Sequence, residues 1–203
     1  MTIITELTAL EEIYGKPGKA ATMKVANHIT PEYRAWIASS SFCALATVGP
    51  EGVDASPRGD IGEVVFELDA QTLAMPDRRG NNRMDSLRNI VRDGRVALML
   101  LTKGSSTVTR VNGRAEVSVA PDLLERFAVK GKLPRSVIVI HIEEIYFQCA
   151  RAVMRAGLWD AENWPDISAL PTAGQILKAQ TAGEMDAVAY DKEWPERAKK
   201  SMW

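Results

Sequence analysis

The sequence contains little of the two side chains that most often bind metals or act as nucleophiles: it has two cysteines and two histidines among 203 residues. Cys43 and Cys149 both lie in apolar, strand-like runs, and neither belongs to a CxxC motif. This pattern predicts buried free thiols rather than a zinc or redox site. His28 and His141 are far apart in the sequence, which disfavours a hydrolytic triad through either one. No metal site is expected.

The chain also lacks a long apolar run and an excess of charge of one sign. No run approaches the ~18 apolar residues of a membrane-spanning helix, and no signal-peptide pattern opens the sequence, so we expect a cytoplasmic protein without membrane contact. Its net charge is -1 and its pI is near 6.2. A general nucleic-acid-binding protein is usually basic, so nucleic acid is not an expected partner. The content of 46% hydrophobic and 25% charged residues is typical of a globular protein.

What the sequence does contain is a change of periodicity near residue 41. Residues 1–40 have a helical pattern, with an apolar stripe at Ile3, Leu7, Leu10 and Tyr14. Short β patterns then follow, with helical patterns at 84–92 and 121–129. The predicted strands are 42–48, 53–57, 64–68, 72–75, 95–101, 107–119, 137–142 and 145–149. Most connections are too short for parallel crossovers, so we predict a mainly β fold, an antiparallel β-barrel with flanking helices.

Three segments follow from these patterns. Residues 1–40 form an N-terminal helical segment that we expect to pack on the barrel, and residues 41–155 form the barrel domain. Residues 156–203 form a C-terminal extension that is part of the same domain or of a dimer interface, with a helix predicted at 172–180. This extension holds four of the five tryptophans, and such side chains are seldom left in water. They are Trp159, Trp164, Trp194 and Trp203. The extension therefore either wraps its own barrel or crosses to a partner subunit.

The most informative stretch is the polar run 75–83, which holds three arginines and two asparagines between a β run and a helical pattern. The arginines are Arg78, Arg79 and Arg83, and the asparagines are Asn81 and Asn82. Helix N-termini carry unpaired N–H groups, and arginine binds phosphate in a bidentate way, so this run favours a small anionic ligand. Two alternatives are a solvated turn with ordinary surface charge and an RNA-interacting module that uses the three arginines.

Four runs of the sequence resemble the FMN-binding split-barrel family typified by pyridoxamine 5'-phosphate oxidase, and in particular its branch of probable FMN-dependent enzymes of unknown substrate. The runs are Ser56-Pro57-Arg58-Gly59-Asp60, Leu73 to Asn89, Arg110-Val111-Asn112-Gly113-Arg114-Ala115 and Cys149 to Asp160. The resemblance covers about residues 35 to 160. It implies a split β-barrel with a Greek-key-like antiparallel arrangement, FMN as cofactor, and a homodimer with flavin at the subunit interface.

The resemblance also implies roles for individual residues. Met75, Pro76 and Asp77 match the strand that lies along the isoalloxazine ring. The phosphate site matches Asn81, Asn82 and Arg83, with Arg79 just upstream, and Arg58 matches a further arginine that reaches the phosphate in the family. An alternative for Arg58 is a turn residue paired to Asp60.

Three other residues have less specific implied roles. Arg110 lies on the polar face of the 107–119 strand, where a partner and the flavin meet in split barrels; alternatively it forms an ion pair at a dimer interface. Arg155 and Trp159 are candidates for lining a substrate pocket, although Trp159 is as consistent with plain packing. No catalytic side chain stands out, because the flavin itself carries the redox step.

The sequence departs from the true oxidase at two places. The oxidase has a lysine shortly after its upstream arginine, where this chain has Gly59-Asp60, and its C-terminal substrate motif is not matched by residues 196–203. The expected function is therefore an FMN-dependent oxidoreductase that acts on an unknown small molecule, with NAD(P)H as a candidate reductant, and not vitamin B6 oxidation. The alternative is a non-catalytic flavin- or haem-related binding protein on the same barrel.

Overall fold

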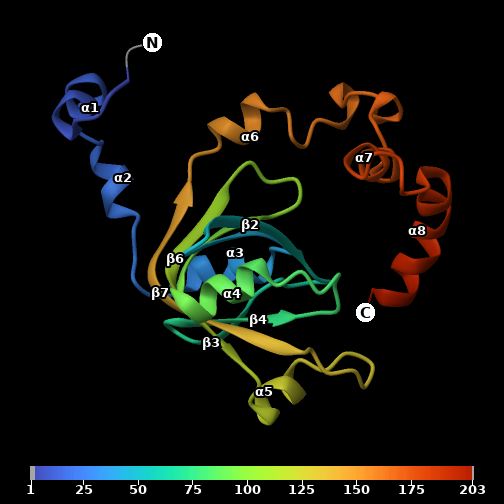
Figure 1. The fold of residues 1–203 in the computed structure, drawn as a ribbon. Coiled ribbons are helices and arrows are strands. Elements are labelled where there is room, and N and C mark those ends of the chain that lie inside the picture. Colours follow the sequence, from blue (N-terminus) through green and yellow to red (C-terminus); the bar gives the residue numbers. More distant parts are fainter. Residues whose placement is uncertain (1–2, 203) are drawn as a thin grey trace.

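The computed structural model describes residues 3–202, and its centre is one seven-stranded antiparallel sheet that curls into a split barrel (Figure 1). The strands are β1 (Phe42–Gly49), β2 (Gly52–Gly59), β3 (Phe66–Asp69), β4 (Thr72–Asp77), β5 (Arg95–Leu101), β6 (Val108–Ser118) and β7 (Ser136–Gln148). Their spatial order is β2-β1-β5-β6-β7-β4-β3. The predicted mainly β split barrel is confirmed. The two last predicted strands are joined in β7, which bends opposite a register shift at Asn112/Gly113 of β6.

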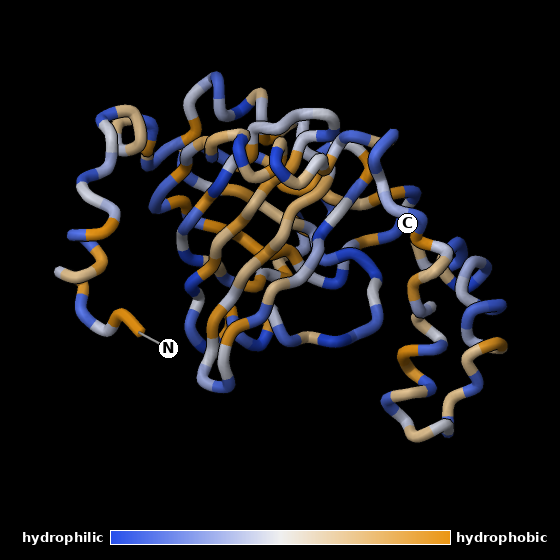
Figure 2. Tube along the Cα trace, turned by 90° about the horizontal axis from the view of Figure 1, so that it is seen from above, coloured by the Kyte–Doolittle hydropathy of each residue, from blue (hydrophilic) through white to orange (hydrophobic). Residues whose placement is uncertain are grey.

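The core fills the inside of this curled sheet. Alternate residues along the central strands are buried, because successive side chains of a strand point to opposite faces. In β5 the buried residues are Val96, Leu98 and Leu100. The hydropathy colouring of Figure 2 shows this apolar interior along the central strands. Two helices cover the barrel: α3 (Pro31–Ala38) buries Ile37, and α4 (Asp85–Arg92) buries Ile90. Asn89 of α4 also donates a hydrogen bond to Thr47 of β1 over 3.1 Å.

α3 and α5 (Pro121–Arg126) begin at residues that favour a helix start. Thr30 caps α3 by accepting a hydrogen bond from the Tyr33 backbone N–H, and Pro31 occupies the first helical position. α5 also begins with a proline. α4 has Met84 at its N-cap with no side-chain cap, so its first N–H groups remain available to another acceptor.

The first two helices extend away from the barrel (Figure 1). α1 (Leu7–Tyr14) and α2 (Lys19–Met23) bury no residue. The predicted apolar stripe faces solvent in the single chain, with Leu7 77% and Tyr14 79% exposed. Of the N-terminal segment, α3 is the helix that packs on the barrel.

The C-terminal extension is an arm of short helices that ends beside the barrel. It contains α6 (Arg151–Arg155), η1 (Ala161–Asn163), η2 (Ile167–Ala169), α7 (Ala173–Gln180) and α8 (Ala187–Ser201). α7 confirms the helix predicted at 172–180 and begins with a capping box between Thr172 and Gln175. α8 packs against α7, and Asp191 accepts hydrogen bonds from the Thr172 hydroxyl and the Gly174 backbone N–H. A Cβ atom at Gly174 would lie 2.4 Å from the Ala187 carbonyl oxygen, so the two helices approach closely there.

The prediction that both cysteines are buried is confirmed for Cys43 and wrong for Cys149. Cys43 is buried in β1, and burial raises the pKa of its thiol to about 12. Cys149 is exposed, because β7 ends at Gln148 and the chain leaves the barrel there. A hydrogen bond from the Arg151 backbone N–H lowers the pKa of the Cys149 thiol. Within residues 3–202, no helix is long and apolar enough to cross a membrane.

Candidate functional site

Two arginine–aspartate pairs bridge the split between the ends of β2 and β4. Arg58 of β2 donates a hydrogen bond to Asp77 at the end of β4 over 2.6 Å. Arg78, the next residue, donates back to Asp60, just beyond β2, over 2.8 Å. All four side chains are between 16% and 21% exposed, so both pairs are largely shielded from water. The alternative pairing of Arg58 with Asp60 is therefore wrong: each arginine crosses the split to the opposite strand.

A cavity of about 590 Å³ opens beside these pairs, and we call it the arginine cavity. Its volume lies within the ~300–1,000 Å³ of small-molecule sites. The lining residues come from β2, the β4–α4 loop, the start of β7 and α8. They are Ser56, Pro57, Arg58, Asp77, Arg78, Gly80, Asn81, Asn82, Arg83, Met84, Leu87, Arg135, Ser136 and Trp194. Four guanidinium groups and one carboxylate thus line the cavity, which favours an anion.

The loop between β4 and α4 is held in a specific conformation. Asn82 adopts φ 64°, in the left-handed region that asparagine tolerates better than most residues. Asn81 accepts a hydrogen bond from the Arg83 backbone N–H over 3.0 Å, and Arg135 donates to the Asn82 side chain over 2.6 Å. This loop places its amides and Met84, the N-cap of α4, at the cavity.

Arg58 and Arg83 of the cavity differ in whether their guanidinium N–H groups have hydrogen-bond partners within the chain. The Nε atom of Arg58 is buried and has no hydrogen-bond partner among residues 3–202. Arg83 is 79% exposed and is paired with Asp85, and this hydrogen bond raises the pKa of its guanidinium. A buried donor without a partner costs free energy, so an acceptor that reaches the Arg58 Nε atom would be stabilising there.

The structure brings together five of the residues that the sequence selected, namely Arg58, Asp77, Asn81, Asn82 and Arg83. Other selected residues lie elsewhere. Met75 and Pro76 are buried within β4 and do not line this cavity, although they directly precede Asp77. Arg79 faces a neighbouring cavity against α8.

The remaining three selected residues are apart from the arginine cavity. Arg110 of β6 stacks over the Tyr146 ring, with 5.1 Å between the guanidinium carbon and the ring centroid. The Trp159 indole donates to the Ser105 carbonyl oxygen over 2.7 Å, which ties the start of the C-terminal arm to the β5–β6 turn. Arg155 is exposed at the end of α6.

Sequence reasoning missed Arg135 and Trp194 as cavity residues. Arg135 lies 53 positions from Asn82, and no spacing pattern connects the two. Trp194 was expected to pack somewhere, but α8, the helix that brings it to the cavity, has a proline in its interior and was not predicted. The sequence indicated that Trp194 packs against another surface, because it is a large apolar side chain in a polar segment, but it did not indicate which surface.

In a comparison with protein-family models, residues 29–149 match the pyridoxamine 5'-phosphate oxidase family. The matched region is more than half of the chain and contains α3 and the whole barrel. The chain belongs to this family. The match leaves out α1, α2 and the C-terminal arm from α6 onward, so Trp194 lies outside the region that defines the family. A search of curated proteins found no match.

Solved structures of similar fold come from several bacteria. HupZ of Group A Streptococcus is 19% identical, with a TM-score of 0.48 over 59% of this chain and 93% of that one. A candidate pyridoxamine 5'-phosphate oxidase of Lactobacillus delbrueckii is 27% identical, with a TM-score of 0.48 over 60% and 95%. An FMN-binding protein of Syntrophomonas wolfei is 15% identical, with a TM-score of 0.43 over 70% and 97%.

The crossed pairs predict a stability effect at Asp60. Asp60→Asn keeps the size of the side chain but removes the charge opposite Arg78, whose other contact is the Phe127 carbonyl oxygen. We expect a loss of about 1–3 kcal/mol in the free energy of unfolding, below the ~3–5 kcal/mol of fully buried pairs. Urea denaturation measures it.

The matched control is Glu51→Gln, which removes the partner of Arg92 in an exposed pair. Because exposed pairs contribute little, this control should change the free energy of unfolding by less than about 0.5–1 kcal/mol. Equal effects of the two substitutions would mean that the pair at Asp60 does not hold the split together.

Proposed function

We propose that this protein binds FMN and acts as an FMN-dependent oxidoreductase on a small molecule, with the flavin phosphate in the arginine cavity. The observation that carries the proposal is the buried Arg58 Nε atom, which has no partner within the described residues. A phosphate oxygen supplies the acceptor that this atom lacks. The family membership of residues 29–149 supports the same assignment.

The other phosphate donors in this proposal come from the β4–α4 loop. Asn82 and Arg83 line the cavity, and the uncapped N-terminus of α4 adds a partial positive charge. Arg79 joins them from the neighbouring wall. FMN phosphate carries nearly two negative charges at neutral pH, which two guanidiniums, amide donors and a helix N-terminus complement.

The flavin ring would then lie along the end of β4, with Met75, Pro76 and Asp77 beside it. Bound flavin supplies the redox chemistry, and the protein contributes binding, orientation and electrostatics. The substrate side stays open in this proposal: Arg155 and Trp159 are its candidate contacts, and NAD(P)H is a candidate reductant. The protein would be cytoplasmic.

The first prediction concerns the phosphate. Arg83→Ala removes an exposed guanidinium whose loss should not disturb the core. Charge-assisted hydrogen bonds contribute ~1.5–3 kcal/mol each, so FMN should bind roughly ten- to a hundredfold more weakly. Riboflavin, which lacks the phosphate, should be affected much less. Fluorescence titration of both flavins measures the two dissociation constants.

Arg88→Ala is the matched control, because Arg88 is an exposed arginine on the following helix, α4, and does not line the arginine cavity. It should leave FMN affinity within about twofold, as expected for a distant charge screened by solvent. Equal losses for FMN and riboflavin in Arg83→Ala would rule out the phosphate role of this loop.

The second prediction concerns the activity. The family's oxidase has a lysine where this chain continues into Gly59-Asp60, and Asp60 is already engaged with Arg78. Without those substrate contacts, transition-state binding of pyridoxamine phosphate should fall. We expect bound flavin to be reduced by dithionite and slowly by NAD(P)H, with negligible oxidation of pyridoxamine phosphate at millimolar concentration. Turnover near ~1 per second would instead identify an oxidase with a different substrate contact.

We also propose that the protein is a homodimer with a flavin at each subunit boundary. The outer face of β1, β2 and β5 is apolar and made of small residues: Ala46 lies opposite Ala55 on one side and Ala97 on the other. Phe42, Val53 and Met99 on the same strands are 44%, 85% and 45% exposed. Small side chains allow a second sheet to approach closely.

This outer face is a better candidate interface than the polar face of β6. Asn112 donates to Glu144 over 2.9 Å, and Arg114 donates to the Asp93 carbonyl oxygen over 2.9 Å, so both are already partnered within the chain. β2 continues from the apolar face into Ser56, Pro57 and Arg58 of the arginine cavity. A second copy on this face would therefore border the cavity, and a two-fold axis would create two equivalent sites.

Ala97→Glu tests the interface. A carboxylate at the centre of an apolar contact is costly to bury without a partner. At micromolar concentration, light scattering should give twice 22.3 kDa for the wild type and 22.3 kDa for Ala97→Glu. Ala21→Glu, which places the same charge on exposed α2, should remain dimeric. A monomeric wild type that binds FMN tightly would contradict the proposed assembly.

A further inference from the structure

A second cavity, of about 810 Å³, lies between Arg79 and one face of α8, and we call it the tail groove. Its residues recur on α8 with helical spacing, so one side of the helix forms a continuous wall. They are Arg79, Ala189, Lys192, Glu193, Glu196, Arg197, Lys200 and Ser201. The proposals made above use none of the α8 residues in this set.

The tail groove and the arginine cavity are neighbours. Arg79 lies in the chain between Arg78 and Gly80, which both line the arginine cavity. From the other side, α8 contributes Trp194 to the arginine cavity and Glu193 to the tail groove. Figures 1 and 2 both show the C-terminal end of α8 beside the barrel. A ligand anchored in one cavity can therefore extend into the other.

The charge in the tail groove is positive. Four cations line it, namely Arg79, Lys192, Arg197 and Lys200, against the two carboxylates of Glu193 and Glu196. Glu196 is already paired with Lys199, which does not line the groove, over 2.9 Å. Within residues 3–202, Arg79, Lys192 and Lys200 form no ion pair with a carboxylate.

Aromatic rings hold the remaining cation in place. The Arg197 guanidinium carbon lies 4.7 Å from the Tyr190 ring centroid and 5.4 Å from that of Trp194. Cation–π contacts of this kind leave the N–H groups at the edge of the guanidinium available for an acceptor. Arg197 thus sits between the two aromatic rings with donors available to the groove.

We propose that the tail groove binds the pyrophosphate of a dinucleotide, as a second anionic subsite beside the arginine cavity. A pyrophosphate linkage carries one negative charge on each phosphate, and two neighbouring charges suit a groove with several unpaired cations. Trp194, 53% exposed, stands where the two cavities meet and offers a ring surface to a base. This inference rests on the proposed function, because it assumes that the FMN phosphate occupies the arginine cavity and leaves the tail groove free.

Two ligands share this chemistry, FAD and NADP(H), and titration calorimetry distinguishes them. One arm compares FAD with FMN on flavin-free protein. The other adds ADP, and then NADPH, to protein saturated with FMN. FAD contains the FMN phosphate. If that phosphate lies in the arginine cavity and the tail groove takes the second, adenosine-side phosphate of FAD, FAD binds more tightly than FMN. If the tail groove takes the pyrophosphate of NADP(H), ADP and NADPH bind to the FMN-loaded protein.

The test variant is Lys192→Gln combined with Lys200→Gln, which removes two groove charges and keeps two long polar side chains. We expect an affinity loss of about tenfold or more for whichever pyrophosphate ligand binds, since charge-assisted hydrogen bonds are the strong ones. FMN affinity should stay unchanged. Lys178→Gln is the control, because Lys178 is an exposed lysine of the same arm on α7 and does not line the groove.

The outcomes separate this inference from the proposed function. The inference is overturned if FAD binds no more tightly than FMN and neither ADP nor NADPH binds the FMN-loaded protein. It is also overturned if the double variant matches Lys178→Gln for every ligand. A different result would reject only the FMN assignment: the protein does not bind FMN, but it binds a pyrophosphate ligand and the double variant weakens that binding. This result would still support the tail groove as a pyrophosphate site.

Discussion

The rest of the site depends on the way β2 and β4 are joined across the split of the barrel. β2 and β4 are not hydrogen-bonded to each other; two arginine–aspartate pairs, Arg58–Asp77 and Arg78–Asp60, cross the split between them. A ladder of backbone hydrogen bonds would close the barrel and leave no space. Ion pairs hold the two strands at side-chain distance instead, and the arginine cavity occupies the space that results. Because both pairs are largely shielded from water, the join is stronger than an exposed pair of the same geometry.

Much of the fold was predictable because it depends on local periodicity. The nearly continuous apolar run 95–101 and the apolar face of 84–92 correspond to β5 and α4 within a residue or two. The arginine run could be selected as a candidate anion site because its residues are contiguous in the chain. Arg135 and Trp194 were not recognisable, since they reach the cavity only after distant segments fold onto it. The crossed pairing of Arg58 and Arg78 also depends on tertiary structure: from sequence, the neighbouring Asp60 was the simpler partner for Arg58.

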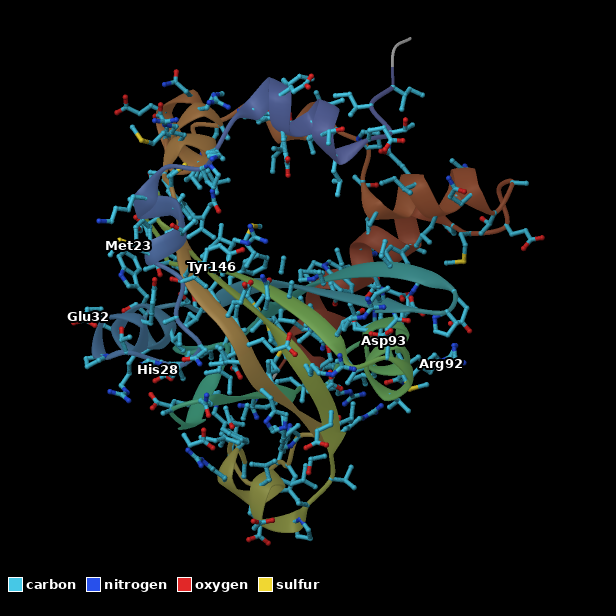
Figure 3. The ribbon with its side chains drawn as sticks, turned by 90° about the vertical axis from the view of Figure 1, so that its left-hand side faces the viewer. Met23, His28, Glu32, Arg92, Asp93 and Tyr146 are labelled. Carbon is cyan, nitrogen blue, oxygen red and sulfur yellow. The ribbon has the colours of Figure 1, made fainter. Side chains whose placement is uncertain are left out.

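The two ends of the described chain show how far a family resemblance extends. The barrel and α3 lie within the matched residues 29–149, whereas α1, α2 and the C-terminal arm do not. In the single chain, the apolar residues Leu7, Leu10 and Tyr14 of α1 are exposed, and the two N-terminal helices stand apart from the sheet (Figure 3). At the other end of the chain, α8 contributes Trp194 to the arginine cavity. The barrel thus lies within the family match, whereas α8, which brings Trp194 to the arginine cavity, lies outside it.

The close packing of α7 against α8 requires glycine at position 174, and this requirement can be checked in the sequences of relatives. The backbones of α7 and α8 approach so closely at this position that a single added carbon would meet the Ala187 carbonyl oxygen. Any larger residue would push the helices apart and, through the rigid body of α8, shift Trp194 relative to the barrel. Among relatives that carry a comparable C-terminal arm, a glycine at this position should therefore accompany a tryptophan twenty residues later, and the two should be lost together.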